Sequence, residues 1–339
     1  MKLSLFLLLI LFASTIGYSQ WVRQTVNTTA SLRGLSVVNE KIVWASGTGG
    51  TVIKTTDGGK NWKVMIVPGA EKLDFRDIEA FDANTAYILS IGNGELSRIY
   101  KTTDGGTTWK EQFRNNNEKA FFDAMVCWDP DHCMAVSDPV EGKFLLISIW
   151  KEESWQVNEY IDGYMPDAKP GEAAFAASGT CIVRPDTNLF FIVTGGSAAR
   201  IFRSHTTVDT GIKWRVFETG LLSGSPGSGI FSIAMYDWRR GVIVGGNYEK
   251  PEEHTNNLGF TDDSGLTWKP GTGLSGYRSG VGYIDKKTII AVGTNGTDIT
   301  RNSGKSWKKI GDENLNSVAA KGKRAVWAVG PKGLVVKMK

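Results

Sequence analysis

The chain has 339 residues, of which 40 are glycine, and 41% of its residues are hydrophobic. This apolar share is sufficient for a folded core, and the glycines favour a turn-rich all-β chain over a disordered one. The formal net charge of +4 is small, so it does not indicate a nucleic-acid partner.

Residues 1–19 have the pattern of a secretory signal peptide. Lys2 supplies a positive charge, Leu3–Ala13 is an apolar run, and residues 17–19 place small residues around a cleavage site. The apolar run is too short for a membrane span, and no cysteine stands at the cleavage site to carry a lipid anchor. We therefore expect a periplasmic or secreted protein whose mature chain, residues 20–339, is one domain.

An eight-residue pattern that begins with Ser or Thr and ends in Trp occurs six times. Residues 55–62, 102–109 and 261–268 are clear copies, and residues 148–155, 207–214 and 300–307 are altered ones. The pattern S/T-x-D-x-G-x-S/T-W suits a hairpin turn, because Asp accepts backbone hydrogen bonds and Gly tolerates positive φ. We interpret the third position as a structural turn residue in each copy that keeps Asp or Asn there: Asp57, Asp104, Asp209, Asp263 and Asn302.

Four short strands recur around each copy. In the first unit they are expected at residues 32–38, 41–46, 51–55 and 62–67. Matching second strands are expected at 85–90, 133–137, 189–194, 241–245, 288–292 and 324–329. Short β-branched runs separated at even spacing by Gly-rich turns are typical of propeller blades.

The two ends of the chain supply one further blade. After the last copy, strands at 317–320, 324–329 and 334–338 lack a fourth partner, and 21–26 is a lone strand that opens with Trp21. Pairing them would close the ring and remove two exposed sheet edges. The sequence therefore predicts an all-β, seven-bladed β-propeller, with the N-terminal strand completing the last blade.

The chain has three cysteines, Cys127, Cys133 and Cys181. The first two flank an expected turn, so the sequence leaves open both a disulfide and buried free thiols. The spacing of Cys127, His132 and Cys133 matches no standard zinc pattern, and we expect no metal.

A ligand site is expected on the face opposite the Trp-ended hairpins, where the first strand of each blade begins. Aligning these strand starts places Arg33, Arg76 and Arg278 at one level. Three guanidinium groups there would form a cradle for a carboxylate or phosphate. The alternative is that each arginine pairs with a nearby acid or is solvated.

Polar residues in the loops of this face extend the set of candidates. The loop at 246–257 is long, and long ordered loops on a rigid scaffold are often functional. Further candidate ligand-binding residues are Arg200, Asn247 and Tyr248. If the face is an active site, the candidate catalytic residues are Asp138, Glu141, Glu172 and His254, whose spacing matches no known catalytic constellation.

The repeated pattern resembles the Asp-box, or BNR repeat, which also occurs in sialidases, xyloglucan-type glycoside hydrolases and sortilin-like receptors. The early Phe/Tyr-Arg-Ile-Pro motif of sialidases is absent, since the similar residues 201–204 lie in mid-chain and lack proline. Through its Thr-Thr-Asp-Gly-Gly-x-x-Trp units and the strands at 42–47 and 325–330, the mature chain resembles the photosystem II stability/assembly factor-like propellers. The resemblance implies an assembly-factor-like protein that binds a protein partner.

Three functions follow, in order of preference. The first is an exported, non-catalytic binding propeller for a protein or anionic ligand, monomeric and not membrane-spanning. The second is a carbohydrate-active hydrolase or lyase on the same face, with a glycan as ligand. The third is an oxidoreductase, the label that the bacterial branch of similar proteins often carries. Because the sequence has no dinucleotide, haem or flavin motif, we expect no cofactor.

Overall fold

The computed structural model describes residues 20–150, 155–157, 165–187, 189–207 and 211–339. The segment predicted as a signal peptide, residues 1–19, lies outside this part of the chain. Apart from one 3-10 turn, the regular secondary structure of the described residues consists of strands. No helix among these residues is long and apolar enough to cross a membrane.

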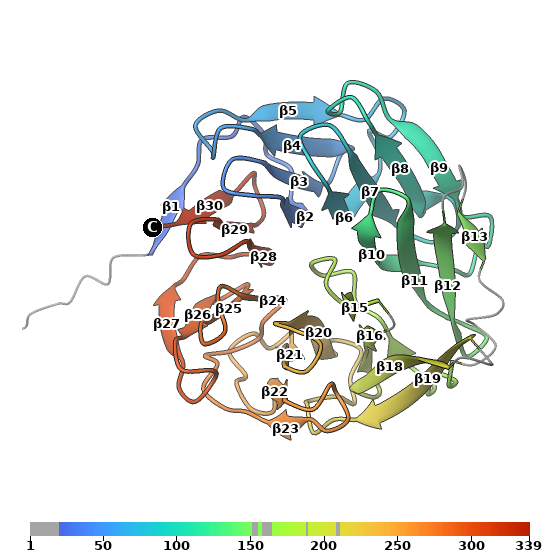
Figure 1. Ribbon diagram of the computed structural model, residues 1–339, viewed down its shortest axis with the longest axis vertical. Coiled ribbons are helices and arrows are strands. Elements are labelled where there is room, and N and C mark those ends of the chain that lie inside the picture. The colour runs from blue at the N-terminus through green and yellow to red at the C-terminus, as the bar shows by residue number, and fades with distance from the viewer. Residues whose placement is uncertain (1–19, 151–154, 158–164, 188, 208–210) are drawn as a thin grey trace, which may run out of the picture.

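Seven antiparallel sheets surround a central channel and follow one another around the ring in chain order (Figure 1). In the first blade, β2 lies next to the channel and β5 lies at the rim. The structure therefore confirms the predicted all-β, seven-bladed propeller.

The strands of the first three blades occur in sequence order. The first blade contains β2 (Leu32–Val37), β3 (Val43–Gly47), β4 (Thr51–Thr55) and β5 (Lys63–Ile66). The second contains β6 (Asp74–Ala80), β7 (Ala86–Ile91), β8 (Arg98–Thr102) and β9 (Lys110–Arg114), with a 3-10 turn, η1 (Gly94–Leu96), before β8. The third contains β10 (Phe122–Asp129), β11 (His132–Val140), β12 (Lys143–Trp150) and β13 (Gln156–Val157).

The remaining blades include one enlarged sheet. The fourth blade contains β15 (Ile182–Asp186), β16 (Leu189–Val193), β18 (Arg200–Thr207) and β19 (Gly211–Glu218). The fifth contains β20 (Ser228–Met235), β21 (Gly241–Asn247), β22 (Leu258–Thr261) and β23 (Lys269–Pro270), and it is extended at β20 by β17 (Gly195–Gly196) and β14 (Glu172–Ala173). The sixth contains β24 (Gly280–Tyr283), β25 (Ile289–Gly293), β26 (Gly296–Thr300) and β27 (Lys308–Gly311).

The seventh blade joins the two ends of the chain as predicted. It contains β28 (Ser317–Ala320), β29 (Val326–Val329), β30 (Val335–Met338) and the N-terminal β1 (Trp21–Arg23). Trp21 pairs with Met338, and its indole Nε1 donates a hydrogen bond to Thr297 Oγ1 of the neighbouring blade at 3.0 Å. The N-terminal strand therefore closes the ring and ties the last two blades together.

The repeated hairpins are held by their own polar side chains. Asp104 Oδ1 accepts a hydrogen bond from the Thr108 N–H at 2.9 Å, and Thr102 Oγ1 accepts one from the Gly106 N–H at 2.9 Å. Hydrogen bonds from the Thr108 hydroxyl and N–H hold the pKa of Asp104 down to about 2. The same contacts occur in the hairpins of Asp57, Asp263 and Asn302. Asp209 lies outside the described residues.

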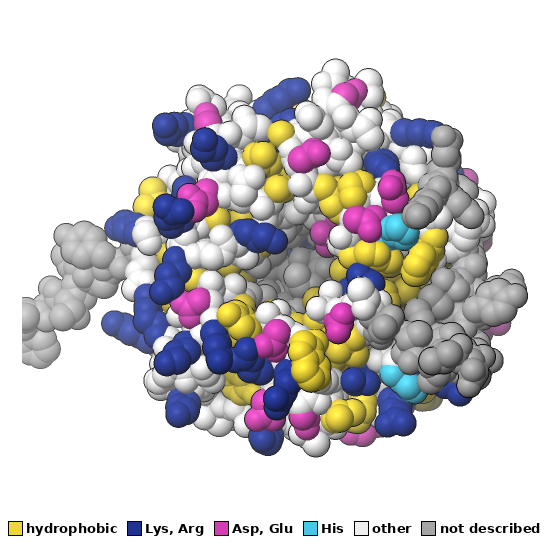
Figure 2. Space-filling model, viewed as in Figure 1, with side chains coloured by type: hydrophobic (Ala, Val, Ile, Leu, Met, Phe, Trp, Pro, Cys, Tyr) yellow, Lys and Arg dark blue, Asp and Glu magenta, His cyan; other side chains and the backbone are white. Residues whose placement is uncertain are grey.

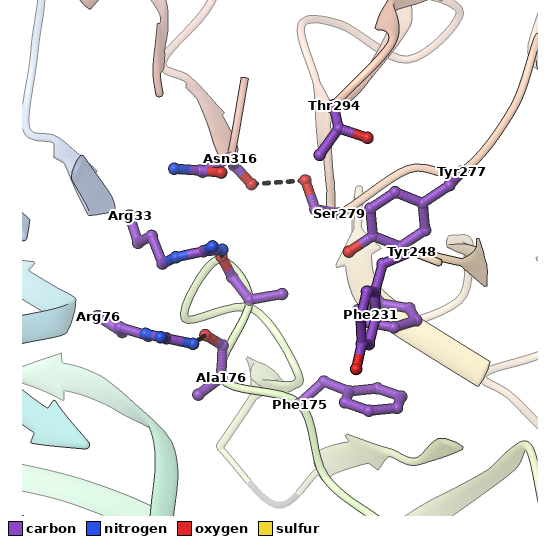
Figure 3. A pocket seen from close by; sticks show the side chains of 11 residues that line it. Arg33, Arg76, Phe175, Ala176, Phe231, Tyr248, Tyr277, Ser279, Thr294 and Asn316 are labelled. Carbon is purple, nitrogen blue, oxygen red and sulfur yellow. Dashed lines mark hydrogen bonds between the residues drawn. The ribbon is translucent and has the colours of Figure 1, made fainter. Parts of the chain in front are cut away.

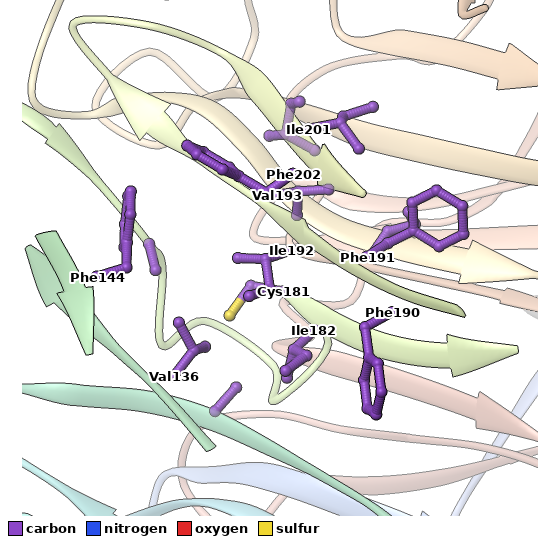
Figure 4. Packing of buried hydrophobic residues seen from close by; sticks show 14 of the residues in the cluster. Val136, Phe144, Cys181, Ile182, Phe190, Phe191, Ile192, Val193, Ile201 and Phe202 are labelled. Atoms are coloured by element: carbon purple, nitrogen blue, oxygen red, sulfur yellow. The ribbon is translucent and has the colours of Figure 1, made fainter. Parts of the chain in front are cut away.

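The hydrophobic core lies between adjacent blades. Its largest cluster joins the third, fourth and fifth blades, where Val136, Phe144 and Phe202 pack around Ile192 (Figure 4). The free thiol of Cys181 is buried in this cluster.

The other two cysteines form a disulfide. Cys127 and Cys133 pair across β10 and β11, with their Cα atoms 4.1 Å apart. This resolves the alternatives that the sequence left open, because residues at paired positions of an antiparallel hairpin lie close enough for a disulfide.

Candidate functional site

A pocket of roughly 330 Å³ opens at the channel, on the face where the first strands of the blades begin (Figure 3). Its walls come from the first, second, fifth, sixth and seventh blades, and from the loop that precedes β15. Segments far apart in the sequence therefore meet at one point on the ring axis.

Arginines form one side of the pocket. Arg33 Nη1 donates a hydrogen bond to the Ala177 carbonyl oxygen at 3.1 Å, and Arg76 Nη1 donates one to the Ala176 carbonyl oxygen at 3.3 Å. Arg76 also pairs with Asp74 through Nε at 2.8 Å. Burial and the nearby Arg76 guanidinium lower the pKa of Arg33. The two cations therefore create a positive potential that favours an anionic group in the pocket.

Aromatic rings form the opposite side (Figure 3). Phe175 stacks on Phe231 with ring centroids 4.0 Å apart, and the edge of Tyr277 meets Phe231 at 4.8 Å. Tyr248 stands at the mouth, with 48% of its surface exposed. The wall thus offers a flat apolar surface that fits an aromatic or aliphatic group.

β-Bulges in the first strands of the blades orient several of the pocket side chains. The register between the first and second strands shifts at Arg33 in β2, at Arg76 in β6, at Asp123 in β10 and at Phe231 in β20. A β-bulge redirects the side chain at the extra residue. Three of the four bulged residues line the pocket, and the fourth, Asp123, is buried within electrostatic reach of Arg76.

Arg278 departs from the expected cradle of three arginines. Its side chain is fully buried, and its Nε and Nη2 donate to Asp298 Oδ2 at 2.9 and 2.6 Å. Its other contacts are Ser275 Oγ, Asn295 Oδ1 and the Tyr277 carbonyl, each at 2.6 Å. Here β24 pairs with β25 in continuous register from Gly280, so Tyr277 and Ser279 face the pocket and Arg278 does not. The cradle is therefore built from two arginines.

Arg200 and Glu172 are likewise held within the fold. They form an ion pair in which Arg200 Nε donates to Glu172 Oε1 at 2.9 Å, and their side chains are 6% and 0% exposed. Thr194 Oγ1 also donates to Glu172 Oε1, at 2.5 Å. This pair fixes the junction of β14 with β17 and β18, and neither group is free to meet a ligand.

The other candidate catalytic residues do not converge. Asp138 lines a separate hollow together with Glu172, and its Oδ1 accepts the Ala174 N–H at 2.9 Å. Glu141 is 77% exposed in an ion pair with Lys119, and His254 is exposed on the loop between β21 and β22. The four candidates therefore do not form a pair of free carboxylates facing one another in a pocket, which is the arrangement that glycoside hydrolysis needs.

Asn247 and Tyr248 are neighbours with different surroundings. Asn247 is buried, and its Oδ1 accepts the Glu249 N–H at 2.9 Å, which shapes the loop. Tyr248 is the member of the pair that lines the pocket.

Several pocket residues were not predicted from the sequence. Phe231, Tyr277 and Asn316 all lie within a few residues of the start of a first strand, as Arg33 and Arg76 do. This shared position near the starts of the first strands is the sequence feature that identifies Phe231, Tyr277 and Asn316 as pocket residues.

Buried carboxylates lie in the second and third blades. Burial raises the pKa of Asp77 to about 7, although Asp77 accepts hydrogen bonds from the Met125 and Ile78 N–H groups at 2.7 and 2.8 Å. Burial also raises the pKa of Asp138 to about 6 and that of Asp123 well above its usual range. Throughout the described ranges, no three His, Cys, Asp or Glu side chains come together in a way that could hold a metal ion.

Comparison with known proteins gives the fold. No protein-family model and no curated protein matches the chain. Among solved structures, YCF48 bound to D1 peptide aligns with a TM-score of 0.67 at 16% identity, over 95% of this chain and 97% of that one. YCF48 from Cyanidioschyzon merolae aligns with a TM-score of 0.67 at 15% identity, over 94% and 98% of the two chains. The WD40 propeller domain of Doa1 aligns with a TM-score of 0.60 at 12% identity, over 94% and 97%.

Proposed function

We propose that the chain is an exported, non-catalytic binding propeller that holds a segment of a partner protein in the axial pocket. In this proposal, Arg33 and Arg76 bind an acidic group of the partner. The adjacent apolar side chain of the partner packs on Phe231 and Tyr277. The observation that carries the proposal is the placement of two guanidinium groups opposite an aromatic wall in one open pocket.

The chemistry of the pocket favours a peptide ligand with both features. Each guanidinium already donates to a backbone carbonyl of the loop before β15, which fixes its direction, and it retains further N–H donors for a carboxylate. Phe175 and Phe231 are already stacked on each other, so their side chains need little further ordering when an apolar group packs on them.

The structural comparisons support a protein partner. One of the propellers with this fold is YCF48 with a bound D1 peptide, so a propeller of this shape is able to hold a peptide. The surroundings of the candidate acids also favour binding over catalysis, because Glu172 is held by Arg200 and Glu141 pairs with Lys119 on the surface.

Export is supported by cysteine chemistry. Disulfides form and persist mainly outside the cytosol, and Cys127 and Cys133 are bonded. The predicted signal peptide at residues 1–19 leads to the same compartment.

A peptide-display selection tests the proposal. A library of random 12-residue peptides is selected on the mature chain and in parallel on the Arg33→Gln/Arg76→Gln variant. A Lys119→Gln/Lys169→Gln variant, which removes two exposed cations elsewhere, is the control. We expect peptides with an acidic residue near an aromatic or aliphatic one, and we expect them to bind the first variant about 10- to 100-fold more weakly. Selected peptides that bind both variants equally would contradict the proposal.

A further inference from the structure

The face that carries the repeated hairpins has a strongly uneven distribution of charge. In the fifth, sixth and seventh blades, the turns between the first and second strands span residues 236–240, 284–288 and 321–325. These turns contain seven cations, which we call the basic arc: Arg239, Arg240, Lys286, Lys287, Lys321, Lys323 and Arg324. The equivalent turns of the second and third blades, residues 81–85 and 130–131, contain Asp82 and Asp131 and no Lys or Arg.

The basic arc keeps an excess of positive charge over the two acids in its turns, Asp237 and Asp285. Lys286, Lys287 and Lys321 are exposed, and none of them forms an ion pair with a described residue. Three arc cations have acidic partners: Lys323 pairs with Asp285 at 3.3 Å, Arg324 pairs with Glu40 at 2.7 Å, and Arg240 pairs with Asp237 of its own turn. These contacts lie at the surface, where ion pairs are weak. Positive charge therefore remains in excess along all three turns.

The neighbouring repeat hairpin extends this surface. The Ser303 N–H donates to the Lys287 carbonyl oxygen at 2.9 Å, which places the hairpin of the sixth blade against the middle turn of the arc. That hairpin adds the exposed Arg301 and Lys305. Figure 2 shows Lys and Arg side chains gathered over the part of the ring that contains β25, β26 and β27.

Exposed aromatic rings lie within the arc. Trp238 is 55% exposed and Tyr236 is 41% exposed, in the same turn as Arg239 and Arg240. The Arg240 guanidinium lies 4.9 Å from the centre of the Tyr236 ring, and Tyr236 packs against Tyr283. Trp and Tyr beside cations are the combination found at the level of lipid headgroups, where the ring is partly in an apolar medium and the charge meets phosphate.

We propose that the basic arc docks the protein on the surface of an anionic lipid bilayer, with Trp238 at headgroup level. The three turns connect the first and second strands of consecutive blades, so they lie on the same face of the ring and a planar surface is able to contact all of them together. A soluble polyanion would use the cations but would give the exposed Trp238 no apolar environment. Docking here leaves the axial pocket, which opens on the opposite face, accessible to a partner. The proposal does not depend on what the pocket binds.

Vesicle co-sedimentation of the mature chain tests this surface. We expect binding to vesicles of mixed phosphatidylglycerol and phosphatidylcholine, little binding to phosphatidylcholine alone, and a loss of binding as salt is raised. The variant Lys286→Glu/Lys287→Glu/Lys321→Glu/Lys323→Glu should bind at least about 10-fold more weakly. Trp238→Ala should lower binding several-fold and leave its salt dependence in place.

A control variant with the same change in net charge shows whether vesicle binding depends on the basic arc or on the charge of the whole protein. Lys72→Glu/Lys119→Glu/Lys143→Glu/Lys169→Glu changes the net charge equally, and all four residues are exposed in loops or at a strand start outside the arc. It should bind anionic vesicles at least about 5-fold more tightly than the arc variant. Equal loss in both quadruple variants, or wild-type binding by the arc variant, would overturn the proposal. Binding to heparin without binding to anionic vesicles would assign the arc to a soluble polyanion and would also overturn it.

Discussion

The two faces of the ring use the same kinds of polar side chain in different ways. On the hairpin face, Asp104 bonds to Thr108, four residues away. On the pocket face, Arg33 bonds to Ala177, 144 residues away, and Arg76 bonds to Ala176, 100 residues away. The hairpin contacts are therefore local and repeat with the sequence, whereas the pocket is assembled by the closed ring.

The comparison also separates two kinds of arginine on the pocket face. Arg33 and Arg76 occupy bulges and face the channel. Both donate to backbone carbonyl oxygens, and Arg76 also pairs with Asp74. Arg278 follows a regular register and is enclosed with Asp298. The first two leave donors for a ligand, and the third stabilises the sixth blade.

The largest effect is expected from Arg278→Ala. Removing it leaves the Asp298 carboxylate buried without its cation, which should lower the free energy of unfolding by about 3–5 kcal/mol. Arg33→Ala, at a half-buried site with one hydrogen bond, should cost only about 1 kcal/mol. Urea denaturation of the two variants measures the contrast. Similar midpoints for both would remove the distinction between structural and ligand-facing arginines.

A smaller loss of stability is expected from Gly265→Ala on the hairpin face. Gly265 has a φ of 75°, and a Cβ there would meet the ring of Phe191. The change should cost about 1–3 kcal/mol through backbone strain and overpacking. It should leave peptide binding in the pocket unchanged, because the hairpin lies on the other face. Thermal unfolding and peptide titration of the same sample check both parts, and weakened peptide binding by the folded variant would show that the faces are coupled.

These differences explain which parts of the structure could be predicted from the sequence. The blade number and the hairpin turns were predicted because their contacts lie within a few residues and recur. The buried position of Arg278 was not predicted. β2 and β6 each have a bulge that turns an arginine toward the channel, whereas β24 has none, so a different residue faces the channel there. Phe175 belongs to a loop between blades, so no repeat alignment includes it. The Cys127–Cys133 disulfide could not be predicted from the spacing of the cysteines alone, because it depends on how β10 pairs with β11.

A more modest effect should appear in the pH dependence of stability. Burial raises the pKa of Asp138 to about 6 from an ordinary value of 3.8, so the folded chain binds more protons than the unfolded chain between about pH 4 and 6. This group therefore lowers stability as the pH rises through that window. Asp138→Asn keeps an oxygen for the Ala174 N–H and should remove this part of the pH dependence.

Unfolding midpoints of the Asp138→Asn variant and the wild type, measured from pH 4 to 8, provide the test. The difference between them should shift in favour of the variant as the pH rises, and it should level off above about pH 6. A difference that stays constant across the range would show that folding leaves the pKa of Asp138 unchanged.

Calorimetric titration of a selected acidic peptide into four proteins tests the central claim most directly. These are the wild type, Arg33→Gln, Arg76→Gln and the double variant, each checked for an unchanged unfolding midpoint. We predict that each single change weakens binding by about 10-fold or more and that the double change weakens it further, because each guanidinium donates charge-assisted hydrogen bonds to the ligand. Wild-type affinity in the folded double variant would contradict the account and would place the ligand site elsewhere on the ring.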